Sequence, residues 1–525
     1  MIAVVAAWIA LLYGMSWHLV GGTSDNAAAV LAGRDMMHGN VVLHGWHLAA
    51  DSFWLLDLPL LGLEAKFGLG PDTFHVVPTL VAAATVLTAM AFAARQANRR
   101  NAVIAALGTF LVIGLPSSLF GAYFLQATMH VVTTLCCLLA FALLAPRRSR
   151  TSQVGGCFLL AIAVSSDPFA VAIGVVPVVV AGLAVCRTRQ PREGVPLVAG
   201  GVLAAIAGEG LARAVTAVGG FRRLPTLALA APSRWVPNLH LAVHDFVYMF
   251  GVRVLPRWPS VAWPARLIHV VGLVFAGAAV ALGLLDLTRR LLVGRGRGTW
   301  IDDVCVVGFV GSVVFFVMVV FPGENVSRAR YLLPATVFGA ILAGRLAGAL
   351  IGSVLDGVSE RATSHMWTSR VSRAVAAALV VVLVAGYAAE TGASARSENP
   401  PNPAVVLAAW LSAHHLTKGW GGYWDATVTT VASHNNIRIR PVIGVGGRLH
   451  AFGNLASATW FAPTGSHREP ATFLVYEPTS PWGNVNLATA TATFGEPVKR
   501  ARVGGFEVLV WDHDTNPQVQ KLVVQ

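Results

Sequence analysis

The 525-residue chain is poor in charged residues, which make up 12% of its composition, whereas 55% of its residues are hydrophobic. Soluble globular domains carry roughly twice that share of charge, so an ordinary soluble fold is excluded. Apolar runs of about twenty residues instead predict helices that cross a bilayer. Acidic residues are scarce enough to leave a net charge of +13. Because the arginines lie in short clusters between apolar runs, this charge does not indicate a nucleic-acid partner.

Cysteine is also scarce, with five residues that all lie inside or at the edge of apolar runs. They have neither the paired spacing of a disulfide framework nor that of a zinc site. The chain shows no internal repeat, although transporters are commonly built from paired repeats. The composition therefore indicates a polytopic α-helical membrane protein without a disulfide or zinc scaffold.

The apolar runs predict about eleven transmembrane helices, at 1–20, 76–94, 102–120, 130–145, 154–166, 169–186, 195–218, 266–288, 302–321, 331–351 and 372–390. The first lacks the basic start and cleavage pattern of a signal peptide, so it is expected to be retained. Arginine clusters recur after every second span, and cytoplasmic loops carry such clusters. They predict a multi-pass protein of the cell membrane with a cytoplasmic amino terminus and an extracytoplasmic carboxyl terminus.

Three long stretches face outward in this topology, at 21–75, 219–265 and from 391 onward. The last changes character, with a helix expected at 404–416 and strands at 437–440, 472–476 and 506–511. We predict a transmembrane domain at 1–390 and an extracytoplasmic α/β or α+β domain at 391–525. The second domain is large enough to form its own core.

Two aspartates of the first outer loop are the catalytic candidates. Asp25 directly follows the first span, and Asp51 lies later in the loop. A carboxylate at the membrane surface, backed by an apolar bundle, is poorly solvated and can act as a general base. The alternative for each is a helix N-cap worth about 1 kcal/mol, Asp25 for a helix at 27–38 and Asp51 for one at 52–67.

Other polar side chains of this loop are candidates for binding sugar or phosphate, namely Arg34, His44, Trp46 and His47. His44 and His47 are three positions apart, which would place them on one helix face. Gly45 between them favours a turn instead. No residue is therefore assigned as a metal ligand.

Two arginine pairs lie at the predicted outer interface, where they could neutralise the phosphate of a lipid. Arg222 and Arg223 begin the second outer stretch, and Arg328 and Arg330 precede a late span. The alternative is interfacial anchoring by snorkelling. The candidate substrate-binding residues in these two places are Arg222, Arg223, Glu324, Arg328, Arg330 and Tyr331.

The first span followed by Asp25, the many-span body, the Arg-Tyr-Leu-Leu-Pro start of a late span at 330–334 and the outer tail resemble the glycosyltransferase family C superfamily. The resemblance implies an enzyme that moves a sugar from a polyprenyl-phosphate donor to an envelope glycan, lipid or protein acceptor. It also implies that Asp25 is the acidic catalytic residue that such enzymes place in the first outer loop. We favour an inverting reaction in which Asp25 is the base.

Some members of that superfamily carry a second acidic residue and a metal, for which Asp35 or Asp51 would be the candidates here. Asp25 lacks an adjacent acidic partner or an Asp-x-Asp pattern. A requirement for Mg²⁺ or Mn²⁺ therefore stays open. The bias toward Ala, Val, Gly and Arg fits an actinobacterial protein, for which a decaprenyl-type carrier would be the natural donor.

Two functions from other classes are compatible with the same features. A transporter or flippase for lipid-linked glycans would use a similar cationic cavity without chemistry. A non-catalytic cell-envelope assembly factor would depend on its tail and not on Asp25. Conversion of a labelled donor by the purified protein distinguishes the enzyme from both.

Overall fold

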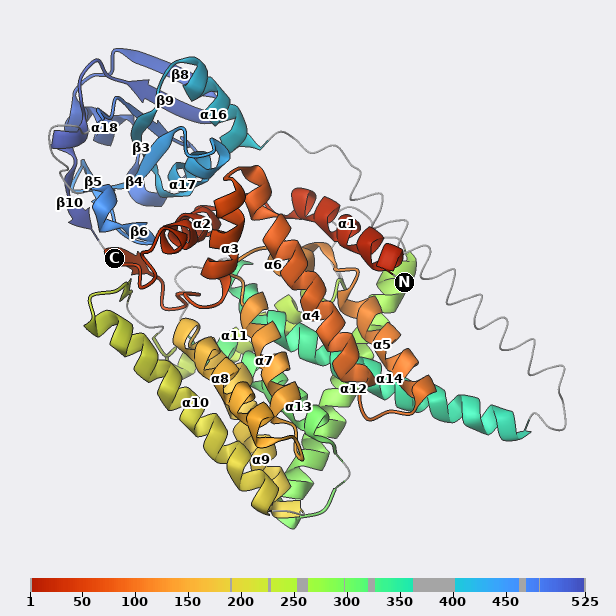
Figure 1. Cartoon of the computed structure of the whole chain (residues 1–525). Coiled ribbons are helices and arrows are strands. Elements are labelled where there is room, and N and C mark those ends of the chain that lie inside the picture. Colours follow the sequence, from red (N-terminus) through yellow and green to blue (C-terminus); the bar gives the residue numbers. More distant parts are fainter. Residues whose placement is uncertain are drawn as a thin grey trace. The chain divides into compact units, whose positions relative to one another are not determined.

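The computed structural model describes residues 2–188, 191–224, 228–252, 263–296, 298–319, 326–361, 402–461, 469–480 and 482–523. The chain forms two compact units (Figure 1). The helical unit comprises Met1–Leu19, Pro78–Gly210 and Leu227–Ser397. The sheet unit comprises Val20–Val77, Leu211–Thr226 and Glu398–Gln525. Each unit is described by itself.

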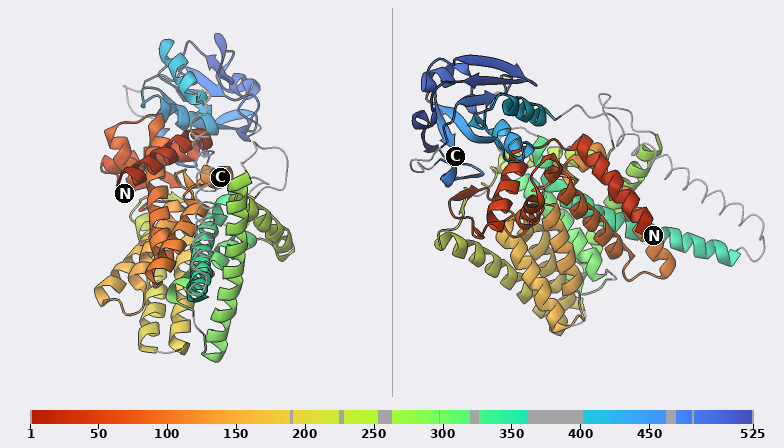
Figure 2. Two further views of the ribbon diagram at one scale, coloured as in Figure 1. Left: turned by 90° about the vertical axis from the view of Figure 1, so that its right-hand side faces the viewer. Right: turned by 45° about the horizontal axis from the view of Figure 1, so that its top comes forward.

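The helical unit is built from helices that pack side by side, as α7 does with α8 and α9 with α13 (Figure 2). Their bounds are α1 Ile2–Leu19, α4 Val76–Ala94, α5 Arg99–Ile113, α6 Ser118–Phe124, α7 Val131–Leu144, α8 Arg150–Ser166, the π-helical turn η2 Val171–Val175, α9 Val176–Thr188, α10 Pro191–Ala217, α11 Pro232–Met249, α12 Trp263–Val293, α13 Trp300–Met318, the 3₁₀ helix η3 Val326–Leu332 and α14 Leu333–Arg361.

Seven helices of the described residues are long and apolar enough to cross a membrane, or eight if α5 and α6, bent by 92°, form one span. The protein is therefore a multi-pass helical membrane protein, as predicted. The other predicted spans include α7, with 14 residues, and α8, with 17. Helices of that length fall short of a hydrocarbon layer of about 30 Å. The last predicted span, 372–390, lies outside the described residues, so the number eleven stays a prediction.

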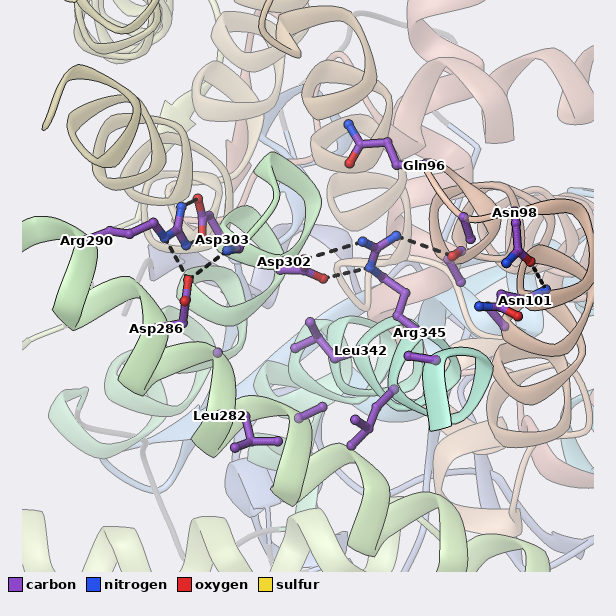
Figure 3. A pocket seen from close by; sticks show the side chains of 18 residues that line it. Gln96, Asn98, Asn101, Leu282, Asp286, Arg290, Asp302, Asp303, Leu342 and Arg345 are labelled. Atoms are coloured by element: carbon purple, nitrogen blue, oxygen red, sulfur yellow. Dashed lines mark hydrogen bonds and ion pairs between the residues drawn. The ribbon is translucent and has the colours of Figure 1, made fainter. Parts of the chain in front are cut away.

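Ion pairs join α12, α13 and α14 at one end of the helical unit (Figure 3). Arg290 on α12 binds Asp286 on the same helix at 2.8 Å and Asp303 on α13 at 2.7 Å. Arg345 on α14 binds Asp302 on α13 at 2.7 Å. A cavity of about 460 Å³ borders these side chains. Because these charges are satisfied by one another, the network acts as a clamp between the three helices.

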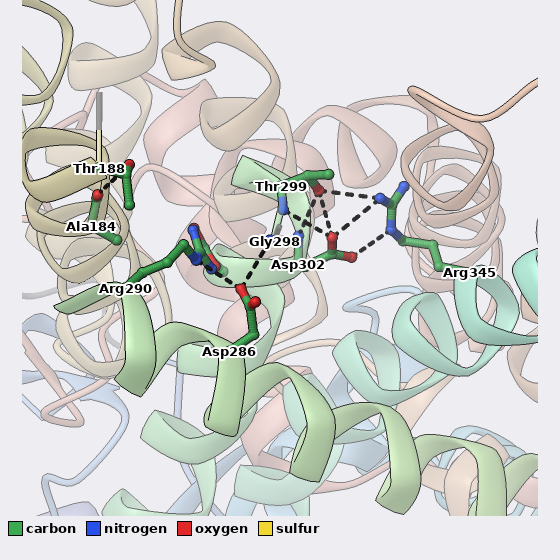
Figure 4. A network of polar contacts seen from close by, with 9 residues as sticks. Ala184, Thr188, Asp286, Arg290, Gly298, Thr299, Asp302 and Arg345 are labelled. Carbon is green, nitrogen blue, oxygen red and sulfur yellow. Dashed lines mark hydrogen bonds and ion pairs between the residues drawn. The ribbon is translucent and has the colours of Figure 1, made fainter. Parts of the chain in front are cut away.

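The start of α13 is fixed within the same network (Figure 4). The Thr299 hydroxyl accepts a hydrogen bond from the Asp302 backbone, and the Asp302 carboxylate accepts one from the Thr299 backbone. This capping box satisfies two amide groups that a helix start leaves without partners. Arg345 also donates to the carbonyl of Arg95 at 2.8 Å. The loop at Arg95 and the start of α13 are therefore held together.

The carboxyl-terminal part of the sheet unit contains a seven-stranded mixed sheet with strand order β10-β5-β4-β3-β7-β9-β8 (Figure 1, blue). The strands are β3 Lys418–Gly422, β4 Arg438–Val445, β5 Arg448–Phe452, β7 Phe473–Tyr476, β8 Lys499–Val503, β9 Phe506–Val510 and β10 Gln520–Val523. The helices are α16 Pro403–Ala413, α17 Tyr423–Ala432 and α18 Leu487–Phe494. The helix predicted at 404–416 and the three predicted strands are confirmed.

Alternating residues of β7 place two apolar cores on opposite faces of this sheet. Phe473 and Val475 pack with residues of α16 and α17, whereas Leu474 and Tyr476 pack with residues of α18. Successive side chains of a strand point to opposite faces, so a strand that is buried on both sides is apolar throughout. The domain is accordingly an α/β sandwich of helix, sheet and helix.

The first outer loop belongs to the sheet unit and contains α2 Ser24–Met37, β1 Trp46–Leu48, α3 Asp57–Phe67 and η1 Pro71–Phe74. Helices α2 and α3 cross where two glycines meet. A Cβ on Gly62 would lie 2.2 Å from the Gly33 carbonyl oxygen, and one on Gly33 would lie 2.2 Å from the carbonyl oxygen of Leu58. Only glycine allows the two backbones to approach this closely.

A three-stranded sheet joins parts of all three predicted outer stretches. Strand β1 pairs in parallel with β2, Arg222–Arg223, and antiparallel with β6, Ala456–Ser457. Residues that pair in one small sheet lie on the same side of a membrane. The predicted domain boundary fell at 390, whereas the compact sheet unit also includes the first loop and residues 211–226.

Candidate functional site

Asp25 lies in the first turn of α2, but it does not cap that helix. The cap is Thr23, whose hydroxyl accepts a hydrogen bond from the backbone of Asn26 at 3.3 Å. The N-cap alternative for Asp25 is therefore wrong, and its half-buried carboxylate has another partner. The phenolic hydroxyl of Tyr423, on α17, donates a hydrogen bond to Asp25 Oδ1.

Tyr423 is itself held in place by the first turn of α2. The Ser24 hydroxyl donates to the Tyr423 carbonyl, and the hydroxyl of Thr427 donates to the Ser24 carbonyl at 3.2 Å. The Tyr423 ring packs against Trp482, with ring centroids 5.1 Å apart. Asp25 Oδ2 accepts no hydrogen bond from the residues that the structure describes. One carboxylate oxygen is thus oriented, and the other can take a proton.

The other acidic candidates of the loop are placed differently. Asp51 lies in a bend, and α3 begins only at Asp57, so the predicted helix 52–67 is shorter than expected and Asp51 does not cap it. Asp35 accepts hydrogen bonds from Asn40 and from the Trp46 indole, each at 2.8 Å. Within the described ranges, no three His, Cys, Asp or Glu side chains converge as metal ligands would.

The two histidines on either side of Gly45 have separate surroundings. Gly45 has a φ of +81° and forms the predicted turn. His44 Nδ1 donates to the Gly219 carbonyl at 2.7 Å, which ties the first loop to the segment before β2. His47 on β1 is paired in register with Arg222. Burial lowers the pKa of His47, and the positive charge of Arg222 lowers it further, so the imidazole is neutral at pH 7.

The carboxyl-terminal end of α2 borders a cavity of about 280 Å³ within the sheet unit. Arg34 and Trp46, both predicted to bind substrate, line it together with Arg438, Arg440 and Trp460. Sequence analysis places residues 437–440 in a strand and assigns no binding role to Arg438 or Arg440. The sequence pattern that could have indicated them is the spacing of two arginines, Arg438 and Arg440, two positions apart on one predicted strand.

The second predicted arginine pair lies in η3 of the helical unit. Arg330 Nη2 donates to the Tyr331 hydroxyl at 3.2 Å, and its guanidinium carbon lies 5.1 Å from the centre of the Tyr331 ring. Arg328 is half-buried in the same turn. Glu324 lies outside the described residues. Asp25 belongs to the sheet unit and this arginine pair to the helical unit, so their action on one donor stays a proposal.

A buried polar cluster packs against the ring of Tyr331. The Tyr331 ring lies 4.7 Å from that of His130. His130 Nδ1 bonds to Asp167 at 2.7 Å, and the Thr133 hydroxyl donates to the same carboxylate oxygen at 2.6 Å. Ionisable groups buried among membrane helices are costly and usually serve a function. Asp167 also accepts a hydrogen bond from the Phe169 backbone at 3.1 Å. Neither Asp167 nor His130 is among the candidate site residues that the sequence predicts.

No family model and no curated protein matches this sequence. Two solved structures are similar to it in fold. The crystal structure of ArnT from Cupriavidus metallidurans bound to undecaprenyl phosphate has a TM-score of 0.54 at 12% identity, covering 97% of this chain and 97% of that chain. ArnT from the same organism in the apo state has a TM-score of 0.52 at 14% identity, covering 99% and 98%. At these identities the likeness shows a shared fold.

Proposed function

We propose that the protein is a membrane glycosyltransferase that moves a sugar from a polyprenyl-phosphate donor to a cell-envelope acceptor on the outer face of the membrane. The observation that carries this proposal is the placement of Asp25. It follows the first span directly, and Tyr423 orients its carboxylate. The fold shared with ArnT, one structure of which holds undecaprenyl phosphate, supports a lipid-phosphate donor.

In the proposed reaction, Asp25 removes the proton from an acceptor hydroxyl, and that oxygen attacks the anomeric carbon of the donor sugar. The bond between the anomeric carbon and the phosphate oxygen breaks, and its electron pair leaves with the lipid phosphate. Attack from the face opposite the phosphate inverts the anomeric configuration. Catalysis by a general base typically contributes about 10²- to 10⁴-fold to such a step.

The leaving phosphate gains negative charge, which cationic groups must stabilise. Arg328 and Arg330 are proposed to hold it, with Arg222 and Arg223 as further contacts on the sheet unit. His47 and Trp46 are proposed to contact the sugar or the phosphate, and Asp51 is retained as a second carboxylate. No step is assigned to a metal ion.

The finer topology is part of the same proposal. Eleven spans, a cytoplasmic amino terminus and an extracytoplasmic sheet unit would place Asp25 at the outer leaflet. The pairing of β1 with β2 and β6 supports a common side for the three outer stretches. An actinobacterial decaprenyl-type carrier is the proposed donor lipid.

The test is transfer by the purified protein in lipid nanodiscs from radiolabelled polyprenyl-phosphate sugars to envelope extract. Asp25→Asn keeps the shape of the side chain but removes the base, so turnover should fall about 10²- to 10⁴-fold. Asp512→Asn, at an exposed carboxylate of the same unit, is the matched control and should transfer normally. Near-normal transfer by a folded Asp25→Asn protein would reject Asp25 as the base. Donor movement across the bilayer without conversion would favour a flippase.

A further inference from the structure

The cavity at the carboxyl-terminal end of α2 has an excess of positive charge. Arg34, Arg438 and Arg440 line it, against the single carboxylate of Asp35. That carboxylate is occupied by the Asn40 amide and the Trp46 indole. In the part of the chain that the structure describes, neither Arg34 nor Arg440 forms an ion pair. The cavity therefore offers guanidinium groups that the protein does not neutralise.

Arg438 has only a weak partner of its own. Its guanidinium reaches Glu469 at 4.0 Å, and both side chains are largely exposed. Exposed pairs of this kind are screened by water and contribute little. Arg438 therefore remains available to a ligand, and it lies two positions from Arg440 on β4. Side chains two apart on a strand point to the same face.

Arg440 is the most constrained of the three arginines. Its guanidinium carbon lies 4.4 Å from the centre of the Trp460 ring, which fixes its direction. Burial and the nearby charge of Arg438 lower the pKa of Arg440 to about 10, so it stays charged at pH 7. A desolvated cation beside a second cation is unfavourable unless an anion is bound. Guanidinium groups also bind carboxylates and phosphates through two parallel hydrogen bonds.

The cavity also contains aromatic surface. Trp46 and Trp460 meet edge to face with ring centroids 5.1 Å apart. Tryptophan offers a large apolar ring face beside polar groups, which suits the apolar face of a sugar ring. Arg34 and Arg440, which form no ion pair among the described residues, and the weakly paired Arg438 lie next to these two indoles. This arrangement fits a saccharide that bears an acidic group better than it fits a free inorganic anion.

The position of this cavity relates it to the proposed base. Arg34 follows Asp25 by nine residues on the same helix, which corresponds to about 14 Å along the helix axis. A bound monosaccharide cannot reach across that distance, whereas an oligosaccharide can. We propose that the cavity is the acceptor subsite for an oligosaccharide with an anionic substituent, either a carboxylate or a phosphate ester. This inference rests on the proposed transferase function.

The experiment measures binding without any donor, by saturation-transfer NMR and calorimetry on the full-length protein in nanodiscs. The probes are maltose 1-phosphate, a glucuronic-acid disaccharide and neutral maltose. At least one anionic disaccharide should bind about tenfold or more tightly than maltose, because charge-assisted hydrogen bonds are the strong ones. The comparison of the two anionic probes tells which substituent the cavity prefers.

Substitutions of arginines that line the cavity test whether the disaccharide binds there. Arg34→Gln and Arg438→Gln should each weaken the preferred anionic probe by about tenfold and leave maltose unchanged. Arg448→Gln, at an exposed arginine of neighbouring β5 that does not line the cavity, is the matched control and should bind normally. Equal affinity for neutral and anionic probes would overturn the proposal, as would unchanged binding by both cavity variants.

A further competition separates acceptor from donor. A short-chain polyprenyl phosphate should not displace the bound disaccharide, and displacement would reassign the cavity to the donor. If the wild type binds the disaccharide but transfers no sugar, the transferase proposal fails and the binding proposal does not. Asp25→Asn should likewise keep disaccharide binding while losing transfer.

Discussion

The hydroxyl of Tyr423 donates a hydrogen bond to the carboxylate of Asp25, although the two residues are 398 positions apart in the sequence. The candidate base follows the first membrane helix, and the residue that orients it begins a helix of the carboxyl-terminal domain. That domain is therefore part of the proposed site. Without α17, Asp25 would lose the contact that fixes its carboxylate.

Removal of the phenolic hydroxyl should lower turnover without unfolding the protein. In Tyr423→Phe the ring keeps its packing against Trp482, but the oriented carboxylate loses one hydrogen bond of about 1.5–3 kcal/mol. We expect transfer to fall by roughly tenfold or more through kcat, measured with the labelled donor. Tyr476→Phe is the control, because that hydroxyl bonds to Glu507 in the sheet. An equal loss of transfer in both variants would show a general effect on the domain.

Glycine at the crossing of α2 and α3 should be essential for stability. In Gly62→Ala the new methyl group would lie 2.2 Å from the Gly33 carbonyl oxygen, a contact that only a backbone shift can relieve. We expect a loss of about 3 kcal/mol, seen as a lower melting temperature in detergent. Gly21→Ala, where an added Cβ has open space, should melt like the wild type. Equal melting of the Gly62 variant would mean that the helices can separate freely.

The stability of the sheet unit should fall as the pH rises toward neutrality. Burial raises the pKa of Asp425 to about 7, and the charge of Glu477 adds to this; burial also raises that of Glu64 to about 7. Their folded-state pKa values exceed the unfolded ones, so the folded state binds more protons. For Asp425, stability is fully present below about pH 4 and declines by up to about 1.4 kcal/mol per pH unit until about pH 7. The contribution of the more exposed Glu64 has the same sign and is smaller because solvent screens it.

Asp425→Asn should remove one of these two contributions. Thermal unfolding between pH 5 and 8 should show a smaller decline for this variant than for the wild type, and the double variant with Glu64→Gln should be flatter still. Asp512→Asn, at an exposed position, should follow the wild-type curve. Parallel curves for the wild type and Asp425→Asn would show that Asp425 is ionised throughout this range.

The clamp between α12 and α13 should be sensitive to the loss of one partner. Asp303→Asn leaves the guanidinium of Arg290 buried with incomplete compensation, and breaking such a pair costs about 3–5 kcal/mol. The double change Arg290→Met with Asp303→Leu should recover much of that stability in thermal unfolding. Arg500→Met breaks an exposed pair with Glu496 and should change stability by less than about 1 kcal/mol. A single variant as stable as the control would contradict the clamp.

The sequence predicted those parts of the fold that leave a local pattern. Apolar runs located most of the helices, and short runs rich in apolar and aromatic residues located β7 and β9. The position of Asp25 after the first span was equally readable. Strands β1, β2 and β6 have only two or three residues, too few for a periodicity, so the small sheet that joins the outer stretches could not be foreseen.

Contacts between residues far apart in the sequence are the part of the candidate site that the sequence did not predict. Nothing in the sequence around Tyr423 connects it with Asp25. His130 and Asp167 are separated by 37 positions, and each looks unremarkable beside its own neighbours. Arg438 and Arg440 were recognised as part of a strand, and only the tertiary structure places them beside Arg34. Packing between distant segments decides such contacts, and it has no signature in a short window of residues.

The pairing of β1 with β6 has a consequence for how the molecule is made. A ribosome releases the chain from its amino terminus, so β1 emerges long before Ala456 and Ser457 exist. Strand β1 therefore lacks this pairing partner until nearly nine-tenths of the chain has been translated. Tyr423, which orients Asp25, is also synthesised late. A prematurely terminated chain would therefore carry an unoriented carboxylate and would leave its lipid donor unreacted.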